Sequence, residues 1–139
     1  MLRFYRYQVA SIEYQGPKGK VVLEKKAGSW KLKKPKSRDI DDDSVDALLT
    51  ALGDIEVERF IDTPPSDLAS VGLQPPEGRI VLKKEDGEEL GTMLISGKGP
   101  KGEKDLFYAK NKKEAWIGLI SKEKKQKLVD KLAPFFEEA

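Results

Sequence analysis

The sequence predicts an α+β domain built mostly from antiparallel β-sheet, with two main helices and one short helix. Three observations lead to this fold class. Short apolar runs are separated by Gly- and Pro-containing turns, and the tetrapeptide GPKG occurs twice in that role, at 16–19 and 99–102. Two segments, 38–53 and 121–136, carry apolar residues at helical spacing. In both halves, strand-like runs follow one another directly, which favours hairpins over parallel βαβ units.

The first half is expected to begin with strands. Apolar residues from Phe4 to Tyr14 place the first strand close to the start of the chain. The segment KVVLEKKAGSWKLKKP (20–35) then contains two β-rich runs, at 21–23 and 30–32, on either side of Ala27-Gly28-Ser29. This arrangement predicts a β-hairpin.

An amphipathic helix is predicted next, within RDIDDDSVDALLTALG (38–53). Four apolar residues fall at the i, i+3, i+4 and i+7 positions, which places them on one helical face. Gly53 stands where helices commonly end. The four apolar residues are Val45, Leu48, Leu49 and Leu52.

A strand and a short helix complete the first half and the link to the second. IEVERFID (55–62) predicts a strand, which the two prolines at 64–65 close. SDLASVGL predicts one or two helical turns, capped by Ser66 or Asp67 and ended by Gly72.

The second half repeats the opening theme. In RIVLKKEDGEELGTMLISG, the apolar triplet 80–82 precedes Gly87 much as the triplet 21–23 precedes Gly28, 59 positions earlier. The repeat indicates two related hairpin-plus-helix sub-units of about 60 residues within one domain. These sub-units are residues 1–62 and 63–139 of a single 1–139 domain.

Two further strands and a helix end the chain. The strands are expected around Phe107 and over 116–120. SKEKKQKLVDKLAPFF then predicts a helix with Ser121 as its N-cap. Its apolar face carries Leu128, Leu132 and Phe135.

Composition excludes several classes of function. The 139 residues carry 26 basic and 24 acidic side chains, and a net charge of +2 argues against a dedicated nucleic-acid binder. With no cysteine and no histidine, the chain forms no disulfide, thiolate nucleophile, imidazole base or Cys/His zinc site. No apolar run approaches the about 20 residues of a membrane span. Because predicted structure begins so early, we expect the chain to be a piece of a longer protein.

The hexapeptide GKGPKG (97–102) matches the G-x-G-x-x-G pattern of dinucleotide-binding loops. Such a loop needs a strand before it and a helix after it, with free backbone N–H groups facing the anion. Pro100 has no N–H, and β-forming residues follow at 106–108. We therefore predict a hairpin loop, whose lysines Lys98, Lys101 and Lys104 offer at most a weak anion-binding surface.

Two kinds of charge cluster admit a functional and a structural interpretation. The acids of RDIDDDS suggest a calcium loop, yet the sixth and twelfth positions counted from Asp39 are Ser44 and Thr50, where such loops need Gly and Glu. Acids that stabilise a helix N-terminus are the favoured interpretation. The lysines of KLKKPK and KEKKQK could face anionic lipid or nucleic acid, although a solvated face is the default.

The ordered set of motifs GSWKLKKP, an amphipathic helix, an Arg in the following strand and GLQPP resembles the DUF4340 family, from about Val9 to Ile120. Its members resemble membrane-anchored extracytoplasmic proteins, and some accompany ABC-type transport systems. The resemblance therefore implies a missing N-terminal anchor, and it supplies no catalytic residues. The matching positions are Gly28, Trp30, Leu32, Pro35, Arg59, Gly72, Leu73 and Pro75.

The same positions also have structural interpretations. Trp30 alternates with Leu32 and suits a core or sheet-covering aromatic. Gly72 suits a left-handed helix end that lets Leu73 pack back. Arg59 either pairs with a neighbouring acid, such as Asp54 or Glu56, or points into a groove.

The expected function is a non-catalytic extracytoplasmic accessory or scaffold domain that binds a membrane or envelope protein or an envelope polymer. The candidate binding residues are Trp30, Arg59, Lys98 and Lys101. No cofactor, metal site or nucleic-acid partner is predicted. Two alternatives stay open: a small carbohydrate-active hydrolase with an Asp/Glu pair, and an anionic-surface binder that uses the lysines.

Overall fold

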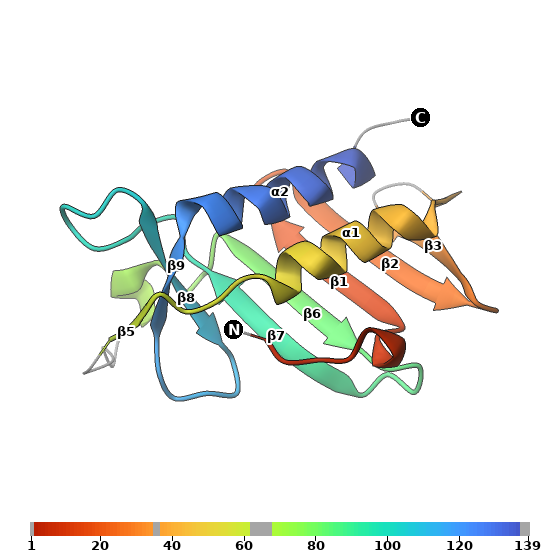
Figure 1. Cartoon of the computed structure of the whole chain (residues 1–139), viewed down its shortest axis with the longest axis horizontal. Helices are drawn as coiled ribbons and strands as arrows, with labels where there is room; N and C mark the ends of the chain where they lie inside the picture. Colours follow the sequence, from red (N-terminus) through yellow and green to blue (C-terminus); the bar gives the residue numbers. More distant parts are fainter. Residues whose placement is uncertain (1, 35–36, 62–67, 137–139) are drawn as a thin grey trace.

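A single antiparallel sheet of nine strands, with two helices across one face, forms the computed structural model of residues 2–34, 37–61 and 68–136 (Figure 1). The strand order is β4-β3-β2-β1-β6-β7-β8-β9-β5. This confirms the predicted α+β class. The strands are β1 (Ser11–Gly16), β2 (Gly19–Lys26), β3 (Ser29–Lys34), β4 (Arg38–Asp39), β5 (Arg59–Phe60), β6 (Gly78–Lys83), β7 (Glu89–Ile95), β8 (Leu106–Asn111) and β9 (Gly118–Ser121), and the helices are α1 (Asp42–Gly53) and α2 (Lys122–Phe136).

The two halves of the chain have the same order of elements. Strands β1 to β4 form a meander followed by α1, and strands β6 to β9 form a second meander followed by α2. The two meanders join through the antiparallel β1–β6 pair, so that one sheet runs through both. The internal sequence repeat aligns the apolar triplet of β2 with that of β6. The order of elements in the structure instead makes β1 the equivalent of β6.

The helices of the two halves correspond residue by residue at a spacing of 80 positions. Asp41 caps α1 by accepting a hydrogen bond from the Asp43 N–H at 3.0 Å, and Ser121 caps α2 by accepting one from the Lys124 N–H at 3.1 Å. Leu48 and Leu128 then occupy equivalent buried positions, as do Leu52 and Leu132. The predicted caps and apolar faces are confirmed.

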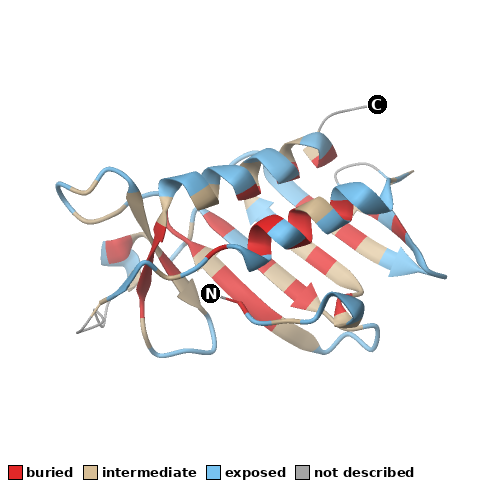
Figure 2. Ribbon diagram, viewed as in Figure 1, coloured by how far each residue is buried: buried red, intermediate tan, exposed pale blue. Residues whose placement is uncertain are grey.

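The main core lies between the sheet and the two helices. Buried residues alternate with half-buried or exposed ones along β1 and β6, and the buried sides of α1 and α2 face the same layer (Figure 2). Ile12 and Tyr14 of β1 and Ile80 and Leu82 of β6 all point into this layer, because their registers pair them across the strands. We call this helix-covered side the inner face and the opposite side the outer face.

Several predicted boundaries are wrong by a few residues. The first strand begins at Ser11, after a 3₁₀ turn at Arg6–Gln8. The predicted 55–62 strand is reduced to Arg59–Phe60, because β5 pairs with β9 over those two residues. Helix α1, in contrast, ends at Gly53 as predicted, and Asp54 after it is in the right-handed helical region.

The predicted short helix is a 3₁₀ turn, η2 (Leu68–Val71). Gly72 follows it with φ +72°, as predicted, and Leu73 is buried immediately afterwards. Ser66, Asp67 and the prolines at 64–65 lie outside the described residues.

The segment around η2 covers one end of the outer face. On β7, Met93 and Ile95 belong to the main core, whereas Leu94 between them packs in a second cluster. That cluster is formed by Val71, Leu73 and Ile117, with Ile61, Leu68, Leu94 and Tyr108 against them. Strands β7 and β8 are therefore covered on both faces around Leu94 and Tyr108, while β2, β1 and β6 are covered on the inner face alone.

Candidate functional site

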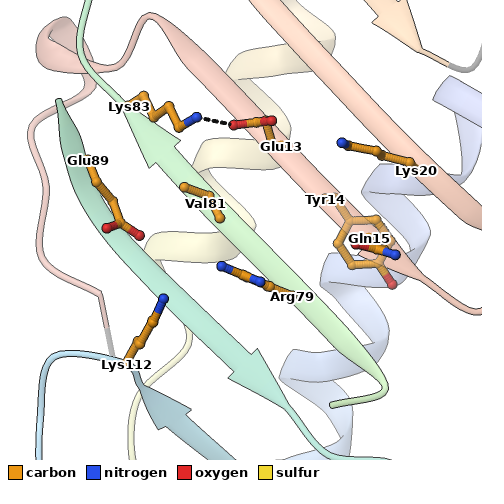
Figure 3. A pocket seen from close by; sticks show the side chains of 9 residues that line it. All are labelled: Glu13, Tyr14, Gln15, Lys20, Arg79, Val81, Lys83, Glu89 and Lys112. Atoms are coloured by element: carbon orange, nitrogen blue, oxygen red, sulfur yellow. Dashed lines mark ion pairs between the residues drawn. The ribbon is translucent and has the colours of Figure 1, made fainter. Parts of the chain in front are cut away.

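The uncovered part of the outer face contains a shallow hollow of about 360 Å³. It lies across β2, β1, β6 and β7 and extends to Lys112, which directly follows β8. Figure 3 shows charged side chains from all of these segments gathered over the strands. The lining residues are Glu13, Tyr14, Gln15, Lys20, Arg79, Val81, Lys83, Glu89 and Lys112.

The two acids of the hollow are already engaged by neighbouring side chains. Lys83 Nζ lies 2.7 Å from a Glu13 carboxylate oxygen, and this hydrogen bond raises the pKa of Lys83 above its ordinary value. The Thr92 hydroxyl donates to the Glu89 carboxylate. Farther along β2, Glu24 lies 3.9 Å from both Lys26 and Lys33.

Three cations of the hollow have no such partner. Within the described part of the chain, no ion pair is formed by Lys20, Arg79 or Lys112. They come from β2, from β6 and from the residue after β8, and all three point over the same surface (Figure 3). The uncovered face therefore presents free positive charge next to a neutralised ion pair.

Trp30, a predicted binding residue, is 5% exposed and belongs to the main core. Its backbone N–H donates to the Asp42 carboxylate at 3.3 Å, which links β3 to the start of α1. Its core interpretation is confirmed, and the ring is not part of the surface.

Arg59 is exposed and forms an ion pair, which was one of the two predictions for it. The partner, however, is neither Asp54 nor Glu56. Its guanidinium lies 2.5 Å from the carboxylate of Glu103, in the loop between β7 and β8. Because the partner is 44 positions away in the chain, local neighbours such as Asp54 could not reveal it.

The GKGPKG segment is a hairpin loop, as predicted. It connects β7 directly to β8, with no helix after the glycines. Lys98 and Lys101 are exposed there, and the Lys98 N–H donates to the Ser96 hydroxyl at 3.0 Å. Arg59 and this loop meet at one end of the sheet, whereas Trp30 lies in the core of the first half.

Three of the four aspartates of the RDIDDDS segment contact neighbouring groups of the protein. Asp41 caps α1, Asp42 binds the Trp30 backbone, and Asp39 lies 4.0 Å from Lys31. In the described ranges, no three acidic side chains cluster so as to hold a metal ion. Nor does any helix there have the length and apolar character that crossing a membrane requires.

Lys125 is a structural residue that the sequence analysis assigned to a solvated lysine face. Its side chain is only 13% exposed, and Nζ lies 3.4 Å from Glu77, 3.1 Å from the Ser96 carbonyl and 3.9 Å from the centre of the Phe107 ring. Near this cluster, burial and then the charge of Glu77 raise the pKa of Tyr14. Its position three residues before buried Leu128 was the available signal, since i and i+3 share a helical side.

Comparison with protein-family models matches residues 30–139 to a domain of unknown function, DUF4340. The match starts later than the expected Val9 and extends beyond the expected Ile120 to the last residue, so it includes all of α2. No curated protein and no solved structure matches the chain. Since the family model covers well over half of the sequence, the chain belongs to the DUF4340 family.

Proposed function

We propose that this is a non-catalytic extracytoplasmic accessory or scaffold domain that binds a partner protein or an envelope polymer through the uncovered outer face of β2, β1 and β6. The observation that carries the proposal is the contrast within that face. The η2 segment covers it around Leu94, Tyr108 and Ile117, whereas the charged hollow lies open beside this cluster.

The shape of the hollow favours a macromolecular ligand. Sites for small molecules are usually concave and enclose most of the ligand surface. Here the side chains stand on a broad sheet, and half-buried Val22 and Val81 lie among them. A wide surface with an apolar floor and charged surroundings resembles the anatomy of protein interfaces.

The location and the association with an ABC-type transport system are proposed from the family. Members of DUF4340 resemble membrane-anchored extracytoplasmic proteins, and membership of this chain rests on 30–139. The proposal therefore predicts that the full-length gene product is held at the outer side of the cell membrane.

The test uses the absence of cysteine from the chain. Lys18→Cys, in the exposed β1–β2 turn, is introduced into the full-length gene product, in which any cysteine outside these 139 residues is replaced by serine, and intact cells are treated with a membrane-impermeant maleimide. We expect labelling from outside and co-purification of a defined partner after crosslinking. Labelling only after lysis, or purification of the crosslinked protein alone, contradicts the proposal.

A further inference from the structure

The three unpaired cations of the outer face form a row that runs obliquely across the strands. In the sheet order β2-β1-β6-β7-β8, Lys20 is on β2, Arg79 is on β6, and Lys112 follows β8. Each cation is thus two strands from the next. Neighbouring strands lie about 4.8 Å apart, so Lys20 and Arg79 are spaced by about 10 Å. Lys112 is also displaced by two residues along its strand, which makes its spacing from Arg79 about 12 Å.

The register places all three on the same side of the sheet. Lys20 pairs with Gln15, and Gln15 pairs in turn with Arg79. The Lys112 N–H donates to the Thr92 carbonyl, which extends the β7–β8 ladder by one residue, and Lys112 lines the same hollow. Because Thr92 pairs with Val81, Lys112 lies one pleat away from the line through Lys20 and Arg79.

An apolar strip accompanies the row. Val22 and Val81 both pair with Glu13 from opposite sides, and both are half-buried on the outer face. The strip is one pleat away from the line through Lys20 and Arg79, since successive outward residues of a strand are two positions apart. A ligand that suits this surface carries negative charges at a regular spacing and apolar groups beside them.

We propose that the outer face binds an acidic amphipathic helix of a partner protein, with carboxylates at positions i, i+7 and i+14. Seven residues of α-helix advance about 10.5 Å and complete nearly two turns, so these carboxylates share one face at close to the spacing of the cations. The helix would cross the strands obliquely, because Lys112 is one pleat away from the line through Lys20 and Arg79. Apolar residues next to them rest on Val22 and Val81. This inference rests on the proposed function and names the chemistry of the partner.

A protein helix fits better than an anionic polymer because of the valines. A polymer of carboxylates or phosphates gains from the cations alone and leaves the apolar strip uncovered. Burying that strip is favourable by about 25 cal/mol per Å² of apolar surface, and an amphipathic helix supplies the matching side chains.

The probe is a fluorescent helical peptide of about 18 residues, long enough to span all three cations. It carries Glu at i, i+7 and i+14 with Leu beside them, and it is compared with an isomer that places the same residues on different faces. Binding to the full 139-residue chain is measured by fluorescence anisotropy. We expect the first peptide to bind at least about tenfold more tightly, and its affinity to fall as salt rises from about 0.05 M to about 0.5 M.

Charge-reversal variants identify the surface. Lys20→Glu, Arg79→Glu and Lys112→Glu are each expected to weaken binding at least about threefold, and the triple variant at least about thirtyfold. The matched controls are Lys122→Glu and Lys127→Glu, which change exposed lysines of α2. Circular dichroism confirms that every variant is folded before binding is compared.

Three outcomes overturn the inference. They are equal binding of the two peptides, equal loss from the α2 controls, and tighter binding of unstructured polyglutamate or polyphosphate than of the helix. If the cellular crosslinking finds a partner whose capture is unaffected by the triple variant, the proposed function stands and this inference falls. If no partner is captured in cells while the peptide with aligned carboxylates binds more tightly than its isomer, the proposed function falls and the binding chemistry of this face stands.

Discussion

On β1 and β6, neighbouring residues of the same strand serve two different surfaces. Ile12 and Leu82 are fully buried beneath the helices, whereas Glu13 and Val81, their neighbours, line the open outer face. The inner face gains its stability from apolar burial against α1 and α2. The outer face contributes less to folding, so its charges are free to serve binding.

The largest expected effect separates the two faces on a single strand. Leu82→Ala removes a fully buried side chain and should lower the free energy of unfolding by about 2–5 kcal/mol. Val81→Ala, one residue earlier and half-buried, should cost about 1 kcal/mol because part of that side chain is already in water. Urea denaturation of both variants measures the difference, and equal losses would show that the outer face is as important for folding as the core.

The second prediction concerns the covered end of the outer face. A Cβ at Gly72 would clash with the Ser96 hydroxyl oxygen, and the backbone there has a φ of +72°, which L side chains rarely adopt. Gly72→Ala should therefore cost about 2–3 kcal/mol. At Gly28, φ is +81°, but a Cβ added there would meet no heavy atom within 4 Å. Gly28→Ala should therefore lower the free energy of unfolding by only about 1 kcal/mol. Thermal unfolding compares the two, and a Gly28 variant that is equally destabilised contradicts a packing role for Gly72.

The third prediction concerns Lys125 and asks whether the contacts of this charged residue stabilise the fold. Lys125→Met keeps the aliphatic stem but removes the contacts with Glu77, the Ser96 carbonyl and the Phe107 ring. The expected loss is about 1 kcal/mol. Lys127→Met, on the exposed side of α2, should leave the unfolding free energy nearly unchanged. Identical denaturation midpoints for the two variants would show that the contacts of Lys125 do not stabilise the fold.

The smallest effect belongs to the ion pair of the outer face. Glu13→Gln removes the partner that raises the pKa of Lys83. Because this ion pair is partly exposed, its loss should lower the free energy of unfolding by less than about 1 kcal/mol at pH 7. A raised folded pKa stabilises the protein fully below the unfolded pKa of Lys83. That stabilisation is lost as pH rises through the folded value, so the wild type and the variant should converge in the alkaline range above the ordinary value of 10.5. A gap that persists or widens there assigns the effect of Glu13 to something other than Lys83.

Local patterns predicted much of the fold because they determine local structure. The spacing of Leu48 and Leu52, and the Asp41 and Ser121 caps, are encoded within single turns of chain. The hairpin around Gly28 follows from turn chemistry alone.

The candidate site depends on distant pairings, and for that reason it escaped the sequence analysis. The row of Lys20, Arg79 and Lys112 exists only because β1 pairs with β6 and places the two meanders side by side. The contact between Arg59 and Glu103 requires β5 to join the far edge of the sheet beside β9. Neither strand order nor the partners of edge strands follow from periodicity.

Photo-crosslinking from the two faces tests the central claim most directly. These 139 residues contain no cysteine, so a benzophenone can be attached at Gln15→Cys on the outer face or at Lys127→Cys on α2, with any cysteine elsewhere in the gene product replaced by serine. Each variant is irradiated in its own cells. The account predicts a specific adduct from Gln15→Cys and little or none from Lys127→Cys. An adduct that forms from Lys127→Cys alone would contradict it, because the partner would then lie on the helix side of the sheet.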